Sequence, residues 1–305
     1  MSELPHGIQR DYPLARLTTI RTGGHAELFA RAGSIDALER ILAWAGAQDV
    51  EVGVVGSGSN LLVADEGVSG LIVKLDQELS KIELDGTRIN CGGGARLPTV
   101  SARAARAGLS GIEFGVNIPG TVGGAVRMNA NAYGGELARA LDWVDVVNAS
   151  GTERRTPEQL GFGYRRSSLA AGEIVARAAF ALEPAEPEQV KQTLADMRRR
   201  RKEAQPSGIK TFGSTFKNPT DPRAEGRSAG QLLQAAGCQG LRFGDAGFSD
   251  KHANFVENLG GATTADVVAL MAEGRRRVKE RFGVELEPEV QALGPVKFPN
   301  GWGGA

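Results

Sequence analysis

The sequence predicts an α+β protein built from three consecutive parts, with boundaries after residues 76 and 200. Three observations lead to this division. A helix pattern between short apolar strand patterns occupies residues 1–76, and strand patterns surround a glycine-rich stretch in residues 77–200. Residues 201–305 alternate two helix patterns with short strands. A chain of 305 residues is long enough for two or three domains.

The first part is predicted to form a β-α-β unit. Residues 34–48 place apolar side chains at helical spacing behind Ser34, whose hydroxyl suits a helix N-cap. Apolar runs at 52–55 and 71–75 predict strands. The run at 61–63 is expected to continue as an apolar strand, rather than as the helix that follows a dinucleotide-binding fingerprint.

The second part is predicted to begin with a hairpin, because strand patterns flank Asp85-Gly86, a pair typical of two-residue hairpin loops. The other elements expected there are a helix over 98–107, strands over 143–148 and 174–182, a turn at 149–152, and a linker or helix entry at 183–188.

The last third is predicted to contain two helices that end at glycines. The expected elements are a helix over 229–236 ended by Gly237, a strand over 253–257, a helix from Thr264 to about residue 281 stopped by Gly283, and an edge strand over 284–290. Pro288 restricts that strand to a sheet edge, because proline cannot donate a backbone hydrogen bond to a neighbouring strand.

The charge of the chain is balanced, with 36 basic and 36 acidic residues. This balance predicts no affinity for nucleic acid or for an anionic membrane surface. One local exception to this balance is a run of five cations at residues 198–202, which follows a helix-compatible stretch that begins at Pro187. Cations are favourable and solvated at the C-terminal end of a helix, which is the interpretation we favour; a patch that faces a ligand is the alternative.

Cysteine and histidine are too few and too scattered to indicate a disulfide framework or a metal centre. Cys91 and Cys238 are isolated, so two buried reduced thiols are expected, and the three histidines lack zinc-ligand spacing. The N-terminus lacks the pattern of a signal peptide, and no apolar run approaches the length of a membrane-spanning helix. We therefore expect a cytoplasmic protein.

The stretch Gly115–Gly135 is the most informative segment of the chain. Its glycines are separated by apolar and amide residues rather than by the serine and charge of a flexible linker. Such a segment can turn backbone N–H groups toward an anion, above all a diphosphate. A second glycine-containing loop, Gly56–Asn60, follows a predicted strand. Two such segments suggest that a dinucleotide is held between them.

The shorter loop alone leaves two interpretations open. It lacks the third glycine of the G-x-G-x-x-G fingerprint, so a nicotinamide-binding Rossmann domain fits poorly. A plain turn between strands is one reading. The side-chain donors of Ser57, Ser59 and Asn60 favour the other, a phosphate site.

Three further motifs combine polar groups with glycine or proline. Arg165 lies beside glycines in residues 161–167, where it can bind a carboxylate through two parallel hydrogen bonds or be a surface arginine. Residues 211–219 bring a hydroxyl, an ammonium and an amide into one loop or turn. Glu287 and Glu289 flank Pro288 and are solvent-exposed in the simpler interpretation. Because these motifs fall in different parts, a cleft between domains is the place where they would meet.

In order and spacing, these motifs closely resemble those of the UDP-N-acetylenolpyruvoylglucosamine reductase family. The resemblance runs from about Thr18 to Gly294. The matching motifs are Arg21-Thr-Gly-Gly24 and those at residues 56–63, 118–125, 128–130, 163–167, 213–219, 228–230, 252–255 and 288–290.

The resemblance implies a two-part FAD-binding region of the vanillyl-alcohol-oxidase type, followed by a substrate domain. Residues 1–76 and 77–200 would be the two FAD-binding subdomains, and 201–305 the substrate domain. The FAD-binding residues implied are Gly56, Ser57, Gly58, Ser59, Asn60, Leu61, Pro119, Gly120, Thr121, Gly123, Gly124, Ala125 and Asn129.

The resemblance also implies the reaction, which is reduction of UDP-N-acetylglucosamine enolpyruvate to UDP-N-acetylmuramate with NADPH, in peptidoglycan precursor synthesis. Arg165, Ser214 and Glu289 would be catalytic. Hydride would pass from flavin N5 to C3 of the enolpyruvyl group, and Ser214 would protonate C2. Lys217 and Asn218, close to Ser214, are candidates for binding the diphosphate of the substrate. The resemblance also makes His252 a substrate contact, although it suits a structural role as well, and Tyr164 either packs against the ligand or braces Arg165.

The chain departs from the family pattern at two glycine positions, which are occupied by Asn117 and Asn131. Asparagine tolerates positive φ better than other non-glycine residues, so we expect the loop conformation to be kept. The spacing from Arg165 to Ser214 indicates the shorter branch of the family, without a tyrosine-bearing insertion. The sequence leaves open the oligomeric state, the choice of NADPH over NADH, the closure of the site and the role of the tail after Gly294.

Two other functions compete with this one. A sugar or alcohol oxidase of the same FAD-binding superfamily would react rapidly with oxygen and would leave Arg165, Ser214 and Glu289 unexplained. A non-catalytic nucleotide-sugar-binding protein would lack flavin absorbance.

Overall fold

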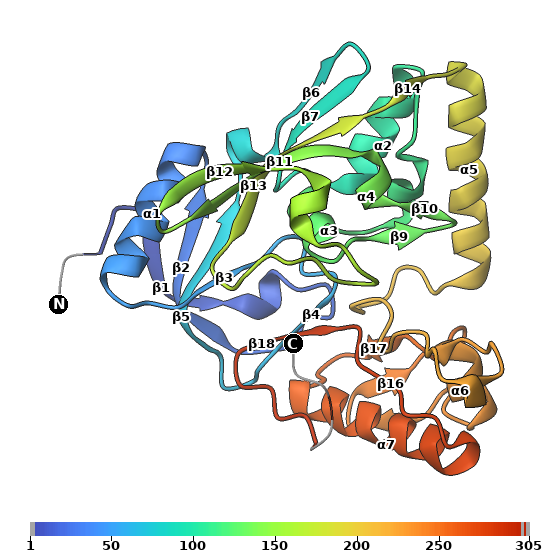
Figure 1. The fold of residues 1–305 in the computed structure, drawn as a ribbon. Helices are drawn as coiled ribbons and strands as arrows, with labels where there is room; N and C mark the ends of the chain where they lie inside the picture. Colours follow the sequence, from blue (N-terminus) through green and yellow to red (C-terminus); the bar gives the residue numbers. More distant parts are fainter. Residues whose placement is uncertain (1–3, 300–301, 303–305) are drawn as a thin grey trace. The chain divides into compact units, whose positions relative to one another are not determined.

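A computed structural model describes residues 4–299 and 302, and its chain divides into two compact units (Figure 1). Unit 1 comprises Met1–Asp11, Leu28–Ser57 and Gly70–Arg201. Unit 2 comprises Tyr12–Glu27, Gly58–Ser69 and Lys202–Ala305. The three-part division of the sequence stays a prediction.

The assignment of Gly58–Ser69 to unit 2 has a physical cause. The strand β4 (Leu61–Val63) pairs in parallel with β18 (Gln291–Leu293), which holds a segment from the first quarter of the chain in unit 2. The hydroxyl of Thr264 also donates to the carbonyl of Val63 at 2.6 Å. Each unit is therefore built from segments that are not consecutive in the chain, which a division into consecutive parts does not describe.

The strands that lie wholly or mainly in unit 1 form two larger sheets and two short pairs. One sheet has the order β1-β2-β5-β3 and the other, antiparallel, has the order β12-β11-β13-β7-β6. The strands are β1 (Ile8–Pro13), β2 (His25–Ala32), β3 (Val52–Val54), β5 (Val68–Leu75), β6 (Ile82–Asp85), β7 (Arg88–Gly92), β8 (Leu109–Ser110), β9 (Asn131–Ala132), β10 (Gly135–Glu136), β11 (Leu141–Asn148), β12 (Gly151–Arg155), β13 (Ile174–Ala181) and β14 (Glu183–Pro184).

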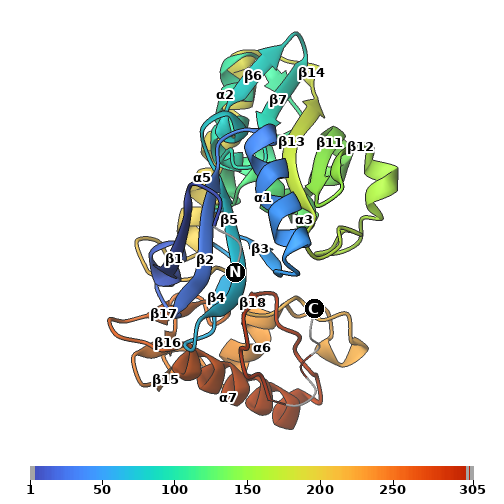
Figure 2. The same cartoon turned by 90° about the vertical axis from the view of Figure 1, so that its left-hand side faces the viewer.

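The helices of unit 1 fill the space between and beside these sheets. They are α1 (Ile35–Ala47), α2 (Leu97–Arg106), α3 (Val122–Arg127), α4 (Leu137–Ala140) and α5 (Pro187–Ala204), with 3-10 turns at Gln77–Ser80, Glu113–Asn117 and Pro157–Leu160. Figure 2 shows α1 between the two larger sheets. Its Leu38 and Leu42 join a buried cluster with residues of both sheets, such as Val73 and Ile174.

The long helix α5 packs along α2 at the edge of unit 1 (Figure 1). Val190 and Leu194 of α5 are buried against Ala105 of α2 and against Val116. Beyond that contact α5 is polar, as expected for a helix that buries only one narrow stripe.

Unit 2 contains a small antiparallel sheet, the β4–β18 pair and two helices around one core. Its elements are a 3-10 turn at Leu14–Arg16, β4, a 3-10 turn at Pro222–Ala224, α6 (Ala229–Ala235), β15 (Arg242–Phe243), β16 (Ala246–Phe248), β17 (Val256–Asn258), α7 (Thr264–Phe282) and β18. Phe212, Phe216 and Trp302 are buried in this core, and Trp302 stacks on Phe298 with ring centroids 5.1 Å apart. Residues 300–301 and 303–305 of the tail lie outside the described residues.

Most predicted elements are confirmed at their expected places. Ser34 caps α1 by accepting from the N–H of Ala37 at 3.2 Å, and Gly283 ends α7 with φ +69°. The hairpin β6–β7 is confirmed, but its two-residue loop is Gly86-Thr87, one residue later than predicted. The N-cap of α7 is Thr263 rather than Thr264.

In the last third, one strand prediction is wrong and another is displaced. The segment 284–290 alternates buried and exposed side chains, yet within it only Pro288 forms a bridge, to Phe216, and the following strand is β18. The missing N–H of Pro288 interrupts a regular ladder. The strand predicted over 253–257 is present as β17, which begins three residues later and ends at Asn258. Asn254, near the start of the predicted range, bonds through its side chain to both backbone groups of Phe216.

The remaining general features of the described residues are simple. Cys91 and Cys238 are buried free thiols, and burial raises the pKa of Cys91 to about 12. No helix in the described part of the chain is long and apolar enough to cross a membrane. The described residues contain no group of three or more His, Cys, Asp or Glu side chains suited to a metal ion.

We predict that Glu173→Gln destabilises unit 1 by about 2 to 3 kcal/mol, because Glu173 accepts charge-assisted hydrogen bonds from Arg155 at 2.5 and 3.0 Å. Those bonds lower the pKa of Glu173. Because the pKa of Glu173 is lower in the folded protein than in the unfolded chain, its ionised form stabilises the fold at any pH above the unfolded pKa. This stabilisation is lost as the pH falls through the folded pKa. Chemical denaturation at neutral and acidic pH measures both effects.

Glu153→Gln is the matched control, since Glu153 pairs with the same arginine but is largely exposed. It should change the free energy of unfolding far less. Equal losses in the two variants, or a gap between wild type and Glu173→Gln that does not shrink in acid, would contradict this account.

Candidate active site

The loop between β3 and β4 has a backbone conformation that depends on glycine. Gly58 has φ +60°, and a Cβ there would lie 2.0 Å from the carbonyl oxygen of Leu17. A Cβ on Gly56 would lie 2.4 Å from the hydroxyl oxygen of Thr121. Gly56 and Thr121 both belong to unit 1, so the two glycine-containing segments singled out in the sequence are in contact at this point.

The backbone N–H groups of residues 57–60 have no protein acceptor within the described part of the chain. Half-buried N–H groups need a partner, which must be water or a ligand. Consecutive free donors in a glycine-containing turn make a concave site for an anion. The hydroxyls of Ser57 and Ser59 add further donors, so the loop fits a phosphate group.

The backbone of the Gly115–Gly135 stretch is used differently from the sequence-based expectation. The N–H groups of Val122 and Gly123 donate to the carbonyls of Ala95 and Gly93, both at 2.8 Å. Those of Gly120, Gly124 and Ala125 also have acceptors inside the protein. The contribution of Pro119, Gly120, Thr121, Gly123, Gly124 and Ala125 to cofactor binding stays a prediction.

Close packing explains several glycines of that stretch. A Cβ on Gly135 would lie 2.5 Å from the ring of Phe114, and one on Gly115 would lie 2.5 Å from the hydroxyl of Ser101. These positions exclude any side chain because neighbouring atoms already fill the space.

Asn129, a predicted cofactor contact, is buried and bonded inside unit 1. Its amide donates to the carboxylate of Glu136 at 2.8 Å and to the carbonyl of Gly163 at 3.2 Å. The second bond ties Asn129 to the segment that carries Tyr164 and Arg165. Its role toward a cofactor stays a prediction.

Arg165 lies in unit 1 on an unusual backbone position. It has φ +57°, a left-handed conformation that is costly for a residue other than glycine and that is often found at functional sites. Its Nη1 donates to the side-chain oxygen of Asn131 at 2.6 Å. Its guanidinium also lies 5.1 Å from the ring centre of Tyr164, whose side chain is largely exposed.

The two asparagines that depart from the family pattern do not use positive φ, contrary to expectation. Asn117 instead donates from its side chain to the carbonyl of Met197 at 2.8 Å, and its own carbonyl accepts from Arg201. Asn131 instead holds Arg165. Each asparagine therefore makes a side-chain contact that glycine cannot make.

Ser214 and Glu289 lie on neighbouring segments of unit 2. The N–H of Glu289 donates to the carbonyl of Thr215 at 2.8 Å, and the N–H of Lys217 donates to the carbonyl of Glu287 at 2.9 Å. These bonds place Glu289 beside Thr215, the residue that follows Ser214. Both candidate residues are only partly buried.

The carbonyl of Glu289 is held by two amide side chains. Asn60 donates to it at 3.2 Å and Gln291 donates to it at 3.0 Å. The N–H of Gln291 in turn donates to the carbonyl of Asn60 at 2.9 Å. The backbone of Glu289 is thus fixed from the N–H side by Thr215 and from the carbonyl side by Asn60 and Gln291.

The predicted substrate contacts of unit 2 are also held by interactions within the chain itself. Lys217 pairs with the exposed Glu287 at 3.3 Å, and the side chain of Asn218 accepts from the N–H of Ala229 at 3.1 Å. His252 accepts from the N–H of Asn254 at 3.2 Å and packs edge-on against Phe255. Burial lowers the pKa of His252, so a neutral imidazole with a structural role is favoured.

The predicted site residues therefore form two groups, each described within its own unit. Tyr164 and Arg165 belong to unit 1, whereas Ser214, Lys217, Asn218, His252 and Glu289 belong to unit 2. Sequence reasoning missed Gln291 and the contact that Asn131 makes. Only the departure from glycine at position 131 marked that residue in advance.

Comparisons with known proteins agree with this picture. A family profile described as "FAD binding domain" matches residues 26–157, and one described as "UDP-N-acetylenolpyruvoylglucosamine reductase, C-terminal domain" matches residues 205–293. The chain is 42% identical over 292 residues to UDP-N-acetylenolpyruvoylglucosamine reductase 2 of Symbiobacterium thermophilum, covering 95% of this chain and 93% of that protein.

Further relatives extend the likeness to a solved structure. The corresponding protein of Anaeromyxobacter sp. is 44% identical, over 94% of this chain and 89% of its own length. The crystal structure of the reductase from Thermus caldophilus is 40% identical, with a TM-score of 0.81 over 94% of this chain and 98% of that one. Identity of this extent over nearly the whole chain settles the family: the chain belongs to the UDP-N-acetylenolpyruvoylglucosamine reductases, which are FAD-dependent oxidoreductases.

Proposed function

We propose that this protein reduces UDP-N-acetylglucosamine enolpyruvate to UDP-N-acetylmuramate with NADPH as reductant, in peptidoglycan precursor synthesis. Family membership supports the substrate and the cofactor. The observation that carries the catalytic assignment is the pairing of residues 215–217 with 287–289, which holds Ser214 and Glu289 on adjacent segments. We place the reaction in the cytoplasm, since charged nucleotide substrates do not cross a bilayer unaided.

One structural observation shows that the residues present are compatible with FAD. The free N–H groups of residues 57–60 are suited to the diphosphate of FAD, and Gly56 allows Thr121 to approach the same loop. When bound and reduced, FAD supplies a hydride to C3 of the enolpyruvyl group. The protein must then stabilise the charge that develops on C2 and the carboxylate, and must deliver a proton to C2.

Arg165 is proposed to stabilise that charge. A guanidinium binds a carboxylate through two parallel hydrogen bonds and remains protonated throughout the reaction. Its usefulness depends on orientation, because a group fixed in advance does not have to reorganise as charge develops. Asn131 supplies this orientation by accepting from Nη1 at 2.6 Å.

Ser214 is proposed to protonate C2, with Glu289 beside the substrate carboxylate. A serine hydroxyl is a weak acid, but an enolate is a strong base, so the transfer is downhill once the hydroxyl is correctly placed. Lys217 and Asn218 follow Ser214 closely in the chain and are proposed to bind the diphosphate of the nucleotide sugar. An absorbance spectrum tests the whole proposal: bound flavin should bleach with NADPH and recover its colour when the enolpyruvyl substrate is added.

We predict that Ser214→Ala leaves the reduction of bound FAD by NADPH near the wild-type rate but slows its reoxidation by substrate about 10²- to 10⁴-fold. Removal of the proton donor affects only the half-reaction that forms the C2–H bond. Stopped-flow absorbance measures the two half-reactions separately. Ser207→Ala, an exposed serine of the same unit, is the control and should change neither rate. Equal slowing of both half-reactions would refute the assignment.

We predict that Asn131→Ala slows reoxidation about tenfold or more, because Arg165 loses an acceptor that orients its guanidinium. Asn131→Asp keeps an acceptor but adds a negative charge that offsets the charge of Arg165. It should therefore be slower still. Stopped-flow reoxidation at saturating substrate measures the effect.

Asn117→Ala serves as the matched control, since its side chain bonds to Met197 and not to Arg165. It should lower stability with little change in reoxidation. If Asn131→Ala reoxidises at the wild-type rate, or if Asn131→Asp is faster than Asn131→Ala, the orienting role is wrong.

A further inference from the structure

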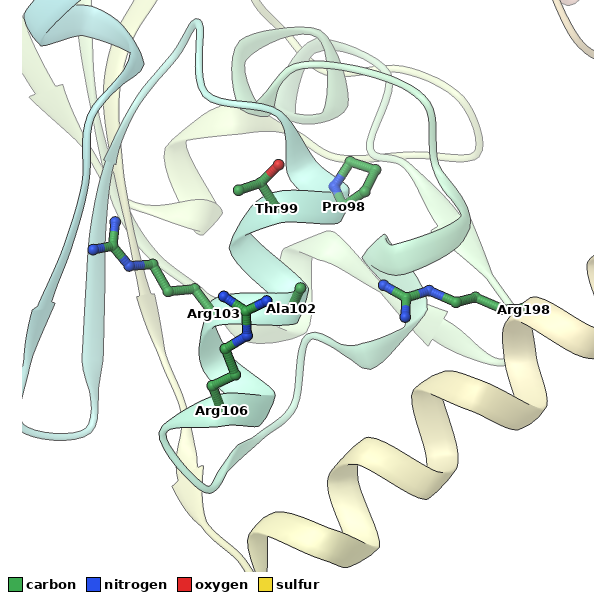
Figure 3. Close-up of a pocket in the computed structure, with 6 residues that line it drawn as sticks. All are labelled: Pro98, Thr99, Ala102, Arg103, Arg106 and Arg198. Atoms are coloured by element: carbon green, nitrogen blue, oxygen red, sulfur yellow. The ribbon is translucent and has the colours of Figure 1, made fainter.

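A pocket of about 520 Å³ lies in unit 1 beside α2 and α5 (Figure 3). Its lining residues are Pro98, Thr99, Ala102, Arg103, Arg106 and Arg198. The first five belong to α2 and Arg198 belongs to α5. None of them has a role in the function proposed above.

Helix packing gathers these side chains in one place. The helix α2 buries Leu97, Val100, Ser101, Ala104 and Ala105, which leaves the lining residues on its opposite side. Leu194 of α5 is buried where α5 packs against Ala105, and Arg198 follows Leu194 by four residues, on the same face of the helix. In Figure 3, Arg198 extends from α5 toward α2.

The charge of the pocket is unbalanced. Three of the six lining residues are arginines and none is acidic. Arg103 donates to the carbonyl of Ile82 at 2.7 Å, whereas Arg106 and Arg198 have no ion pair or side-chain hydrogen bond with any described residue. The adjacent Arg199, by contrast, pairs with Asp196 at 3.0 Å. In a chain of zero formal net charge, this local excess of positive charge requires an explanation.

We propose that this pocket binds a phosphate-bearing small molecule with several negative charges. One guanidinium group can form two parallel hydrogen bonds with the oxygens of one phosphate group. Three guanidinium groups therefore suit a di- or triphosphate better than a single carboxylate. The hydroxyl of Thr99 adds a donor, and Pro98 and Ala102 add an apolar surface. The volume lies within the range of small-molecule sites. The proposal is independent of the proposed reduction and of its site residues.

The cations at 198–202 therefore lie in different environments. The interpretation of the whole run as a solvated helix end does not apply to every residue in it. Arg201 is partly buried and bonds to the carbonyl of Asn117, and burial lowers its pKa. Arg199 is paired on the surface. Arg198 is the member of the run that lines the pocket. The alternative interpretation, a cation that faces a ligand, is therefore proposed for Arg198 alone.

Calorimetric titration of the FAD-loaded protein with inorganic tripolyphosphate and, separately, with ATP tests the proposal. The wild type should bind one equivalent saturably. The double variant Arg106→Gln/Arg198→Gln should bind at least about tenfold more weakly, because two of the three guanidiniums are removed. Both residues are exposed, so the fold should be retained, and thermal unfolding checks this.

The matched control is Arg199→Gln/Arg200→Gln, which removes the same charge from the two residues of α5 that follow Arg198 but does not alter the pocket lining. It should bind as the wild type does. Lys217→Gln, which removes the proposed diphosphate contact of unit 2, should also leave the affinity unchanged. This variant separates failure of the pocket from failure of the proposed function.

Each outcome decides between supporting and overturning the proposal. Tighter binding of ATP than of tripolyphosphate supports it and identifies a nucleotide, and equal binding supports it and identifies the phosphate chain as the recognised group. Equal weakening in the two double variants overturns it in favour of general surface charge. Absence of saturable binding, loss of binding in Lys217→Gln, or binding of polyglutamate in place of tripolyphosphate also overturns it.

Discussion

The parallel pairing of β4 with β18 is the interaction on which the candidate site of unit 2 depends. Leu61–Val63 immediately follows the loop that ends at Asn60, and Gln291–Leu293 immediately follows the segment of Glu289. One short ladder therefore fixes the end of the loop and the backbone of a candidate catalytic residue together. The side chain of Asn60 adds a direct bond to the carbonyl of Glu289. A shift of one residue in this register would remove both relations at once.

Local signals were sufficient to predict most of the fold. The hydroxyl of Ser34, the Asp85-Gly86 pair and Gly283 act within a few residues, and the elements that they indicate are present. The failures have long-range causes. The β4–β18 pairing joins residues more than two hundred positions apart, and Asn254 bonds to Phe216, which is 38 positions away. Periodicity in one segment contains no information about such partners.

Motif order in the sequence proposes Arg165, Ser214 and Glu289, and their catalytic assignment stays a prediction. The side chains that hold Arg165 and Glu289 are known only from the structure. Asn131 was noticed because it replaces glycine, but the expected reason, tolerance of positive φ, was wrong. Its bond to Arg165 is made by the amide of the side chain, and a rule about backbone conformation cannot predict that contact.

The two glycine-containing segments, which look alike in the sequence, have different physical roles. In residues 57–60 the N–H groups have no acceptor among the described residues, so this loop can donate to an anion. The N–H groups of Val122 and Gly123 are already bonded to Ala95 and Gly93, and a Cβ on Gly123 would lie 3.2 Å from the carbonyl oxygen of Gly93, a tight contact that favours glycine. A diphosphate recognised by backbone donors would therefore depend mainly on the shorter loop. The longer stretch would contribute by its shape, through the approach of Thr121 to Gly56, so the density of glycine alone does not indicate which segment binds the anion.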